Sequence, residues 1–287
     1  TTEFNGSRLL DGTFGTQQFQ VGANSNQTIT TSTANLRTNV YGNNQLQAAG
    51  GDAAADVFGA NSTTAGSLTI NGSLGTTTID IIANSTAKAN ADKINLAVAT
   101  TGVVATSRTS VSLAFDAPGS YSLTLQSDNA GPQAVAFSIS AIATGDGLSA
   151  AVAAINDQSS KTGVTASLNA AGTAVVLTNA TGNDISIADT TVVNVGNVTV
   201  QKLDSTGANA GASVLLGGDA NPETATVVGY VTLDSDKSFS ADVTDTNLLA
   251  ADIGSTLNKV SDLDVTTFGK ATEALKTVDS ALAFISG

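Results

Sequence analysis

Alternating hydrophobic and polar residues dominate the middle of the chain. Five short runs have the period of two that half-buried strands require, and turn-forming Gly, Asn and Asp residues separate them. These runs are residues 68–70, 111–115, 123–125, 135–139 and 185–187. The pattern predicts a β-rich region from Ser62 onward. Residues 41–61 are instead rich in Gly, Asn, Gln and Ala, and predict a connector that carries one short Ala-rich helix.

Two Ala-rich segments, 85–97 and 147–156, interrupt the strands and predict helices. Each ends with Ile-Asn, each is followed by Thr-Gly-Val, and the matched features lie 61 positions apart. The matched pairs are Ile94 and Ile155, Asn95 and Asn156, Gly102 and Gly163, and Ala105 and Ala166. Ile-Asn, Thr-Gly-Val and the later Ala thus share one offset, and these three features predict a tandem repeat over about 62–126 and 127–190. The alternative is a chance match in a sequence of low complexity.

The last section of the chain has a helical period. Apolar residues are spaced 4, 3, 4 and 3, which gives a coiled-coil-like stripe that needs a partner helix. The stripe consists of Ala271, Leu275, Val278, Leu282 and Ile285. It predicts a helix that Thr266 or Thr267 caps and that ends near Ser286. Upstream, residues 247–260 place Leu248, Leu249, Ile253 and Leu257 on one side and predict a second, shorter helix.

Near the N-terminus, the pair Asp11-Gly12 lies between apolar residues, and Phe19 and Val21 alternate with a polar residue. This combination is typical of a hairpin, here over residues 9–21. Neither this hairpin nor the final helix buries its apolar face alone, so we expect the two to pack together. The residues expected to form packing or assembly contacts are Leu10, Phe14, Phe19, Leu275, Val278, Leu282 and Ile285.

Composition limits the chemistry that the 287 residues can perform. The chain contains neither Cys nor His, so a thiolate metal site, a Ser-His-Asp triad and a His-based zinc site are impossible within it. No cofactor is expected. The formal net charge of −13 repels nucleic acid phosphates and anionic lipids, so neither nucleic acid nor membrane is an expected partner.

Paired carboxylates are the remaining candidates for chemistry. Asp234 with Asp236, and Asp262 with Asp264, could bind Ca²⁺ weakly or act as the acid and base of a glycosidase. Neither pair continues into an EF-hand loop, so solvated turns or helix caps are the favoured interpretation. A hydrolase that uses only carboxylates is a remote alternative, and we expect no enzymatic activity.

Particular segments resemble a known family. Residues 4–15 and 19–24 resemble the conserved-domain hairpin of bacterial flagellins. Residues 253–264 and 271–282 resemble the start of the flagellin C-terminal conserved region. The repeated Ile-Asn and Thr-Gly-Val features are similar to the flagellin insertion motif of the variable outer domain.

The resemblance implies an α+β structural subunit of the flagellar filament, self-assembling for motility and located outside the cell on the flagellum or cell surface. It implies a central fragment that lacks the terminal helices, with a conserved helix-plus-hairpin domain at 1–45 and 233–287 and a variable β-rich domain at 46–232. The implied partners are other flagellin subunits, the flagellar export apparatus and its chaperone, with surface glycans or host receptors as further candidates.

The alternative function is that of a flagellin-like surface protein that binds polysaccharide or mediates adhesion. A cleft lined by Arg8, Arg37, Lys93 or Lys270 would favour it.

Overall fold

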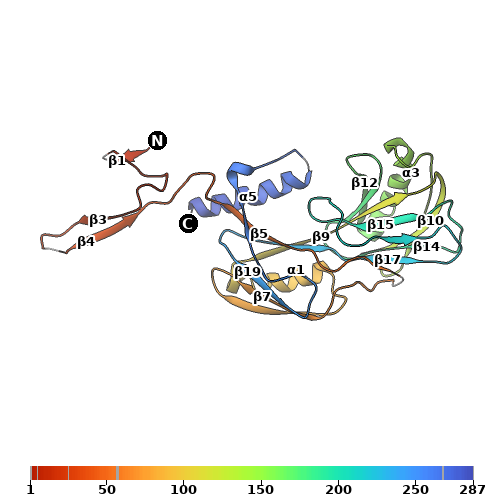
Figure 1. Ribbon diagram of the computed structural model, residues 1–287, viewed down its shortest axis with the longest axis horizontal. Coiled ribbons are helices and arrows are strands. Elements are labelled where there is room, and N and C mark those ends of the chain that lie inside the picture. The colour runs from red at the N-terminus through yellow and green to blue at the C-terminus, as the bar shows by residue number, and fades with distance from the viewer. Residues whose placement is uncertain (1, 5, 25, 56–57, 267, 287) are drawn as a thin grey trace. The chain divides into compact units, whose positions relative to one another are not determined.

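The computed structural model describes residues 2–4, 6–24, 26–55, 58–266 and 268–286, and the chain forms two compact α+β units (Figure 1). The smaller unit comprises Thr1–Gln45, Ser235–Ser238 and Thr256–Gly287. The larger unit comprises Leu46–Asp234 and Phe239–Ser255. None of the described helices is long and apolar enough to cross a membrane.

Two hairpins begin the smaller unit. Strand β1 (Glu3–Phe4) pairs with β2 (Ser7–Arg8), and Asn5 lies outside the described residues. Strand β3 (Thr16–Gln20) pairs with β4 (Thr28–Ser32), which places Phe19 opposite Ile29.

The hairpin predicted over residues 9–21 is therefore wrong, although its turn exists. The backbone N–H of Thr13 donates to Asp11 Oδ1 at 3.0 Å, and Gly12 has a φ of +80°. Gly12 and Gly15 both adopt left-handed backbone angles, which interrupt an extended run between this turn and β3. The Thr-rich segment of β4 instead supplies the partner of β3.

The rest of the smaller unit comprises one strand pair and a long helix. Strand β21 (Thr256–Lys259) pairs antiparallel with the start of β5 (Gly42–Ala48), and the 3₁₀ turn η1 (Val260–Asp262) follows. Helix α5 (Phe268–Ser286) confirms the predicted final helix. It begins one residue after Thr267, which lies outside the described residues, so the predicted Thr267 cap is not described.

Two helix predictions are wrong. Residues 247–260 contain β20 (Ile253–Gly254) and all of β21, because Gly254 disfavours a helix and residues 256–259 pair with β5. In the predicted connector, the described residues contain β5 and the short strand β6 (Ala54–Ala55) in place of an Ala-rich helix. Residues 56 and 57 of that segment lie outside the description. Pairing with other strands overrides the weak helical preference of these runs.

The larger unit contains sheets built mainly from antiparallel neighbours. In one, the order is β20, β19 (Ser240–Thr244), β7 (Gly66–Asn71) and β8 (Thr76–Ile81). In another, the order is β11 (Gln133–Ile139), β10 (Gly119–Gln126), β14 (Ile185–Asp189), β17 (Thr224–Val227) and β6.

A third sheet places β12 (Val164–Leu168), β13 (Val175–Asn179), β9 (Val104–Phe115) and β18 (Tyr230–Ser235) side by side. Strand β15 (Val198–Lys202) joins β9 and also pairs with β16 (Val214–Leu216). The five predicted strand runs lie in β7, β9, β10, β11 and β14, so these predictions are confirmed.

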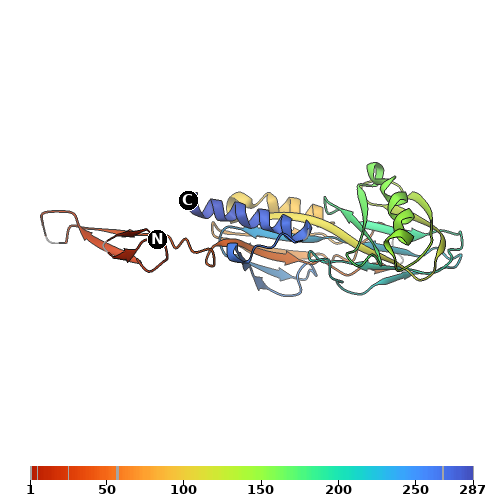
Figure 2. The same cartoon turned by 90° about the horizontal axis from the view of Figure 1, so that it is seen from above.

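Four helices of the larger unit cover these strands. Helices α1 (Ala87–Asn95) and α3 (Gly145–Asn156) confirm both predicted Ala-rich helices, and short α2 (Val98–Thr101) and α4 (Ser159–Thr162) follow them. Helix α3, green in Figures 1 and 2, packs against β11, β12 and β13. Strand β9 contributes to two hydrophobic cores, with Ala105 in the core around α1 and Leu113 in the core around α3.

An asparagine ends each of these longer helices and forms the same pair of hydrogen bonds. Asn95 Nδ2 donates to the carbonyl oxygen of Ala105 at 2.9 Å, and the N–H of Ala105 donates to Asn95 Oδ1 at 2.8 Å. Asn156 makes the same two bonds with Ala166, at 2.9 and 2.8 Å. The amide thus imitates a neighbouring strand and fixes where the next strand begins.

The Thr-Gly-Val segments also share one local structure. The hydroxyl groups of Thr101 and Thr162 each donate to a carbonyl oxygen four residues earlier at 3.0 Å. Gly102 and Gly163 follow with φ of +74° and +68°, angles that Gly adopts without strain. The matched sequence features therefore form matched structures, whereas the predicted repeat boundaries stay a prediction.

The asparagine contacts predict a measurable stability effect. Replacing Asn95 or Asn156 with Ala leaves two backbone groups without their side-chain partner, and we expect each change to lower the free energy of unfolding by about 1–2 kcal/mol. Denaturant titration followed by circular dichroism measures it. The exposed Asn221, changed to Ala, is the control and should alter stability by less than about 0.5 kcal/mol. Equal effects at all three positions would contradict the structural role.

A buried lysine holds the backbone that follows β5. Lys202, at the end of β15, is only 2% exposed, and its Nζ donates to the carbonyl oxygens of Ala49 and Gly51 at 2.5 and 2.6 Å. Burial lowers the pKa of Lys202 to about 8. Burial also raises the pKa of Asp184 to about 6, against the lowering effect of the hydrogen bond from Asn61.

The raised pKa of Asp184 predicts that the stability of the folded protein depends on pH. Its pKa is about 6 in the folded protein against an ordinary value of 3.8, so the folded state binds more protons than the unfolded chain between these values. The contribution of Asp184 to the free energy of unfolding is complete below about pH 4 and is lost as the pH rises through 6. It totals about 2–3 kcal/mol. Relative to Asp184→Asn, the wild-type protein should lose this stability between pH 4 and 6 in denaturant titrations. A difference that stays constant with pH would contradict the prediction.

Candidate assembly surface on the final helix

Helix α5 is aligned on strand β5 by three side-chain contacts. Residues 41, 43 and 45 contact α5 residues of decreasing number, so the strand and the helix run in opposite directions. The contacts are ring stacking of Tyr41 on Phe284 at 5.2 Å, a 3.2 Å hydrogen bond from Ser280 Oγ to Asn43 Oδ1, and a hydrogen bond from Gln45 Nε2 to Glu273 Oε2. The ammonium group of Lys237 lies 5.3 Å from the centre of the Phe284 ring, a favourable cation–π arrangement.

The buried face of α5 is made of small residues. Ala274, Thr277 and Ala281 are buried, and the Thr277 hydroxyl donates to the carbonyl oxygen of Glu273 at 3.0 Å. Small side chains allow a helix to approach its neighbour closely, and the hydrogen bond satisfies the one polar group among them.

Four large apolar residues of α5 lie outside this contact, whereas Phe284 stacks on Tyr41. Leu275 is 67% exposed, Leu282 60%, Ile285 53% and Val278 40%. These four residues are called the α5 stripe below. The expected packing of the N-terminal hairpin over this stripe is wrong, because a covering hairpin would bury it. The helix instead turns its small residues inward, and a contiguous apolar surface of this kind usually marks an interaction site.

The N-terminal residues of the predicted contact set are mostly exposed as well. Leu10 and Phe19 remain exposed, whereas Phe14 is buried. Gln17 Nε2 donates to the carbonyl oxygen of Phe14 at 2.9 Å, which helps to fix this turn. A role of Leu10, Phe14 and Phe19 in assembly stays a prediction.

The predicted acidic pairs have structural partners. Asp264 accepts hydrogen bonds from Lys270 Nζ at 2.6 Å and from the backbone N–H of Thr266 at 2.8 Å, and together with the Thr266 hydroxyl these hold the pKa of Asp264 below its usual range. Asp236 lies 3.7 Å from Lys237, and Asp262 accepts from the hydroxyl of Ser261. Within the described ranges, no group of three Asp, Glu, His or Cys residues is placed to hold a metal ion.

The basic residues considered for ligand binding also have local partners. Arg8 and Arg37 lie 3.6 and 3.2 Å from the Asp11 carboxylate, and Lys270 pairs with Asp264. Lys93 Nζ donates to the backbone carbonyl oxygen of Asp80 at 2.8 Å. Each of these basic residues therefore makes its contact within its own unit.

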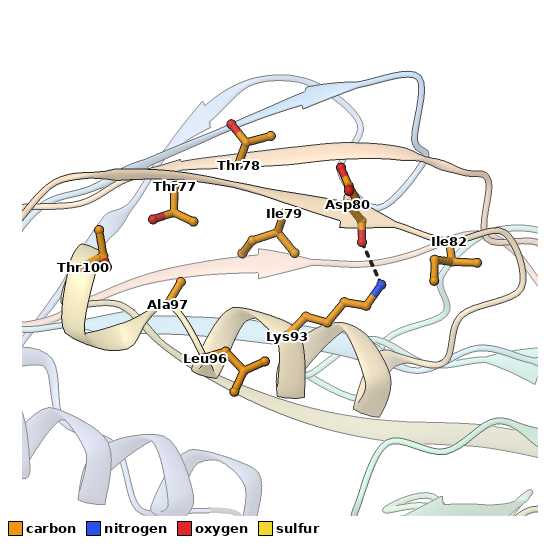
Figure 3. Close-up of a pocket in the computed structure, with 9 residues that line it drawn as sticks. All are labelled: Thr77, Thr78, Ile79, Asp80, Ile82, Lys93, Leu96, Ala97 and Thr100. Atoms are coloured by element: carbon orange, nitrogen blue, oxygen red, sulfur yellow. Dashed lines mark hydrogen bonds between the residues drawn. The ribbon is translucent and has the colours of Figure 1, made fainter.

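A surface groove of about 610 Å³ lies between β8 and the helices α1 and α2 of the larger unit (Figure 3). Its walls carry threonines and aliphatic residues, with Asp80 and Lys93 toward one end in the view. No aromatic side chain lines it. No sequence pattern indicated it, because Ile82 follows Ile81 and Leu96 precedes Ala97 and Val98, so their exposure is evident only from the structure.

Comparison with known proteins connects both ends and the repeat to one family. Residues 122–181 match the family model of the flagellin hook IN motif, which includes α3 and the Thr-Gly-Val segment after it. The chain is 30% identical to the B-type flagellin of Pseudomonas aeruginosa over 299 aligned positions. That alignment covers 99% of this chain and 58% of the relative, so the chain spans little more than half of that protein.

Two structures of the flagellar cap protein FliD from Escherichia coli show only weak similarity. The structure of its D1-D2-D3 domains is 15% identical with a TM-score of 0.21, covering 87% of this chain and 74% of that one. The structure of its D2-D3 domains is 18% identical with a TM-score of 0.19, covering 79% and 95%. These scores are too low to support a structural argument. The sequence matches carry the comparison: the chain is similar to flagellins, through the hook IN motif at residues 122–181 and through the alignment with the B-type flagellin.

Proposed function

We propose that this chain is part of a structural subunit of the bacterial flagellar filament and that the α5 stripe is an assembly surface. The observation that carries this proposal is the exposure of four large apolar residues on one side of a helix whose neighbouring, small-residue side is already packed. Relationship to a flagellin along almost the whole chain supports the filament role.

The stripe has the period expected for contact with another helix. Its positions 275, 278, 282 and 285 repeat at 3 and 4 residues, which is the spacing of helices that pack side by side. Burying each Leu or Ile stabilises a contact by about 1.5–3 kcal/mol. The occupants that fit are apolar helices from other parts of the complete subunit and from neighbouring subunits.

The same proposal assigns each unit to a part of the filament subunit and gives the location and partners of that subunit. The smaller unit would belong to the conserved, filament-forming part, and the larger unit to the variable part on the outside of the filament. The assembled subunit would be extracellular, with other subunits, the export apparatus and its chaperone as partners. The charge of −13 favours solubility before assembly. No catalytic activity is part of this proposal.

One substitution tests the assembly surface. In the full-length protein, Leu282→Asp places a charge in the stripe, and we expect it to block or strongly slow filament growth because a charge in an apolar helix contact is costly. Pelleting of filaments by ultracentrifugation, compared with the wild type, measures assembly.

Ala283→Asp is the matched control, since Ala283 is exposed, adjacent and outside the stripe. It adds the same charge to the same helix and should leave assembly largely intact. Circular dichroism should show both variants folded. Normal assembly of Leu282→Asp, or equal loss in both variants, would show that the stripe is not an assembly surface.

A further inference from the structure

Strand β8 forms an edge of its sheet, and the hairpin register shows which of its backbone groups face outward. Within the part of the chain that the structure describes, β8 pairs with β7 alone. The N–H of Gly72 donates to the carbonyl oxygen of Gly75 at 2.9 Å and closes the turn. Because hydrogen-bonded pairs alternate along an antiparallel ladder, the next such pair is Ile70 with Thr77.

The residues between these pairs therefore direct their N–H and C=O groups away from β7. They are Thr76, Thr78 and Asp80. The hydroxyls of Thr69 and Thr78 lie 2.9 Å apart, as expected where the facing residues do not exchange backbone hydrogen bonds. The outward carbonyl of Asp80 is occupied by the flexible ammonium group of Lys93. An edge with free, regularly spaced backbone groups can accept one more strand.

The groove runs along this same edge. Figure 3 shows the side chains of Thr77 and Ile79 between β8 and the helices, with Ala97 and Leu96 on the helical side. Leu96 is 88% exposed, and Ile82 at the other end is 60% exposed. Every second side chain of an added strand would point into this groove and meet an apolar wall.

The second copy of the repeat closes the corresponding space. The caps Thr86 and Thr144 that begin α1 and α3 are 58 positions apart, and the same offset relates Thr77 to Val135 and Ile79 to Phe137. Val135 is buried whereas Thr77 is only partly buried, Phe137 is larger than the buried Ile79, and α3 packs closely against β11.

The residues that follow α1 and α3 also differ between the open groove and the closed space. Leu96 follows α1 where Asp157 follows α3, so an apolar residue replaces a charged one at the rim of the open groove. The shared fold does not require the groove. The groove results from smaller residues on β8 and from the position of α1, which packs more against β9 than against β8.

We propose that the β8 edge and its groove bind an extended peptide segment of a partner protein, which adds to the sheet as a strand. The segment would alternate apolar residues, which enter the groove, with basic residues, which lie on the other face beside Asp80. The exposed Asp80, Asp242 two strands away on that face, and the net charge of −13 favour a cationic partner. This site lies outside the α5 stripe and does not depend on the filament role.

The test uses a labelled, end-capped heptapeptide that alternates lysine and valine. We expect saturable binding by fluorescence anisotropy, weakened at least about tenfold by Thr78→Pro, which removes an outward N–H without breaking the β7 ladder. Ile79→Phe and Leu96→Asp, which copy the closed repeat, should weaken binding similarly. Val192→Asp, on an exposed loop of the same unit, should not. Circular dichroism checks that each variant is folded.

Peptide controls separate strand addition from charge attraction. A peptide of the same composition with its lysines and valines in two blocks, and one with N-methylated backbone amides on one edge, should both bind at least about tenfold more weakly. Equal binding of either control, or binding unaffected by Thr78→Pro, Ile79→Phe and Leu96→Asp, would overturn the proposal. It would also be overturned if the protein self-associated through β8 and Thr78→Pro released monomers, because a second copy would then be the occupant.

Discussion

The side-chain contacts between helix α5 and residues 41–45 determine which face of that helix is free. Ala274, Thr277 and Ala281 are buried, and larger residues at these positions would move the helix outward. The ring stack at Tyr41 and the hydrogen bond at Asn43 then fix both the rotation and the direction of the helix. With those contacts satisfied, the leucines of the stripe must face outward, which is where a subunit interface needs them.

This arrangement explains why the sequence predicted the helix but not its packing. Leu275 and Leu282 mark the period of α5 clearly, and that period gave the correct element. Hydrophobicity alone suggested that the same residues would be buried within the chain. Ala and Thr carry little hydrophobic signal, so the face that is buried could not be recognised without the partner strand.

Long-range pairing accounts for the other failures. The helix predicted over residues 247–260 rests on the spacing of Leu248, Leu249, Ile253 and Leu257. In the structure, residues 253–254 and 256–259 instead form strands that pair with β19 and β5. The burial of Lys202 was not predicted, because a single lysine at the end of a short strand carries no signal by itself. Its position was readable, since it follows Val198 and Val200 at a period of two on the buried face of β15.

The two repeat copies show which parts of such a motif are constrained. Asn95 and Asn156 must each reach both backbone groups of one residue ten positions ahead, and Gly102 and Gly163 must adopt positive φ. Together these requirements set the path from helix to strand. Residues on the edge strand carry no such requirement, so Ile79 and Phe137 can differ while the path stays the same. The same helix-to-strand connection is therefore compatible with a filled space beside β11 and an open groove beside β8. This difference is the physical reason for proposing peptide binding at the first copy alone.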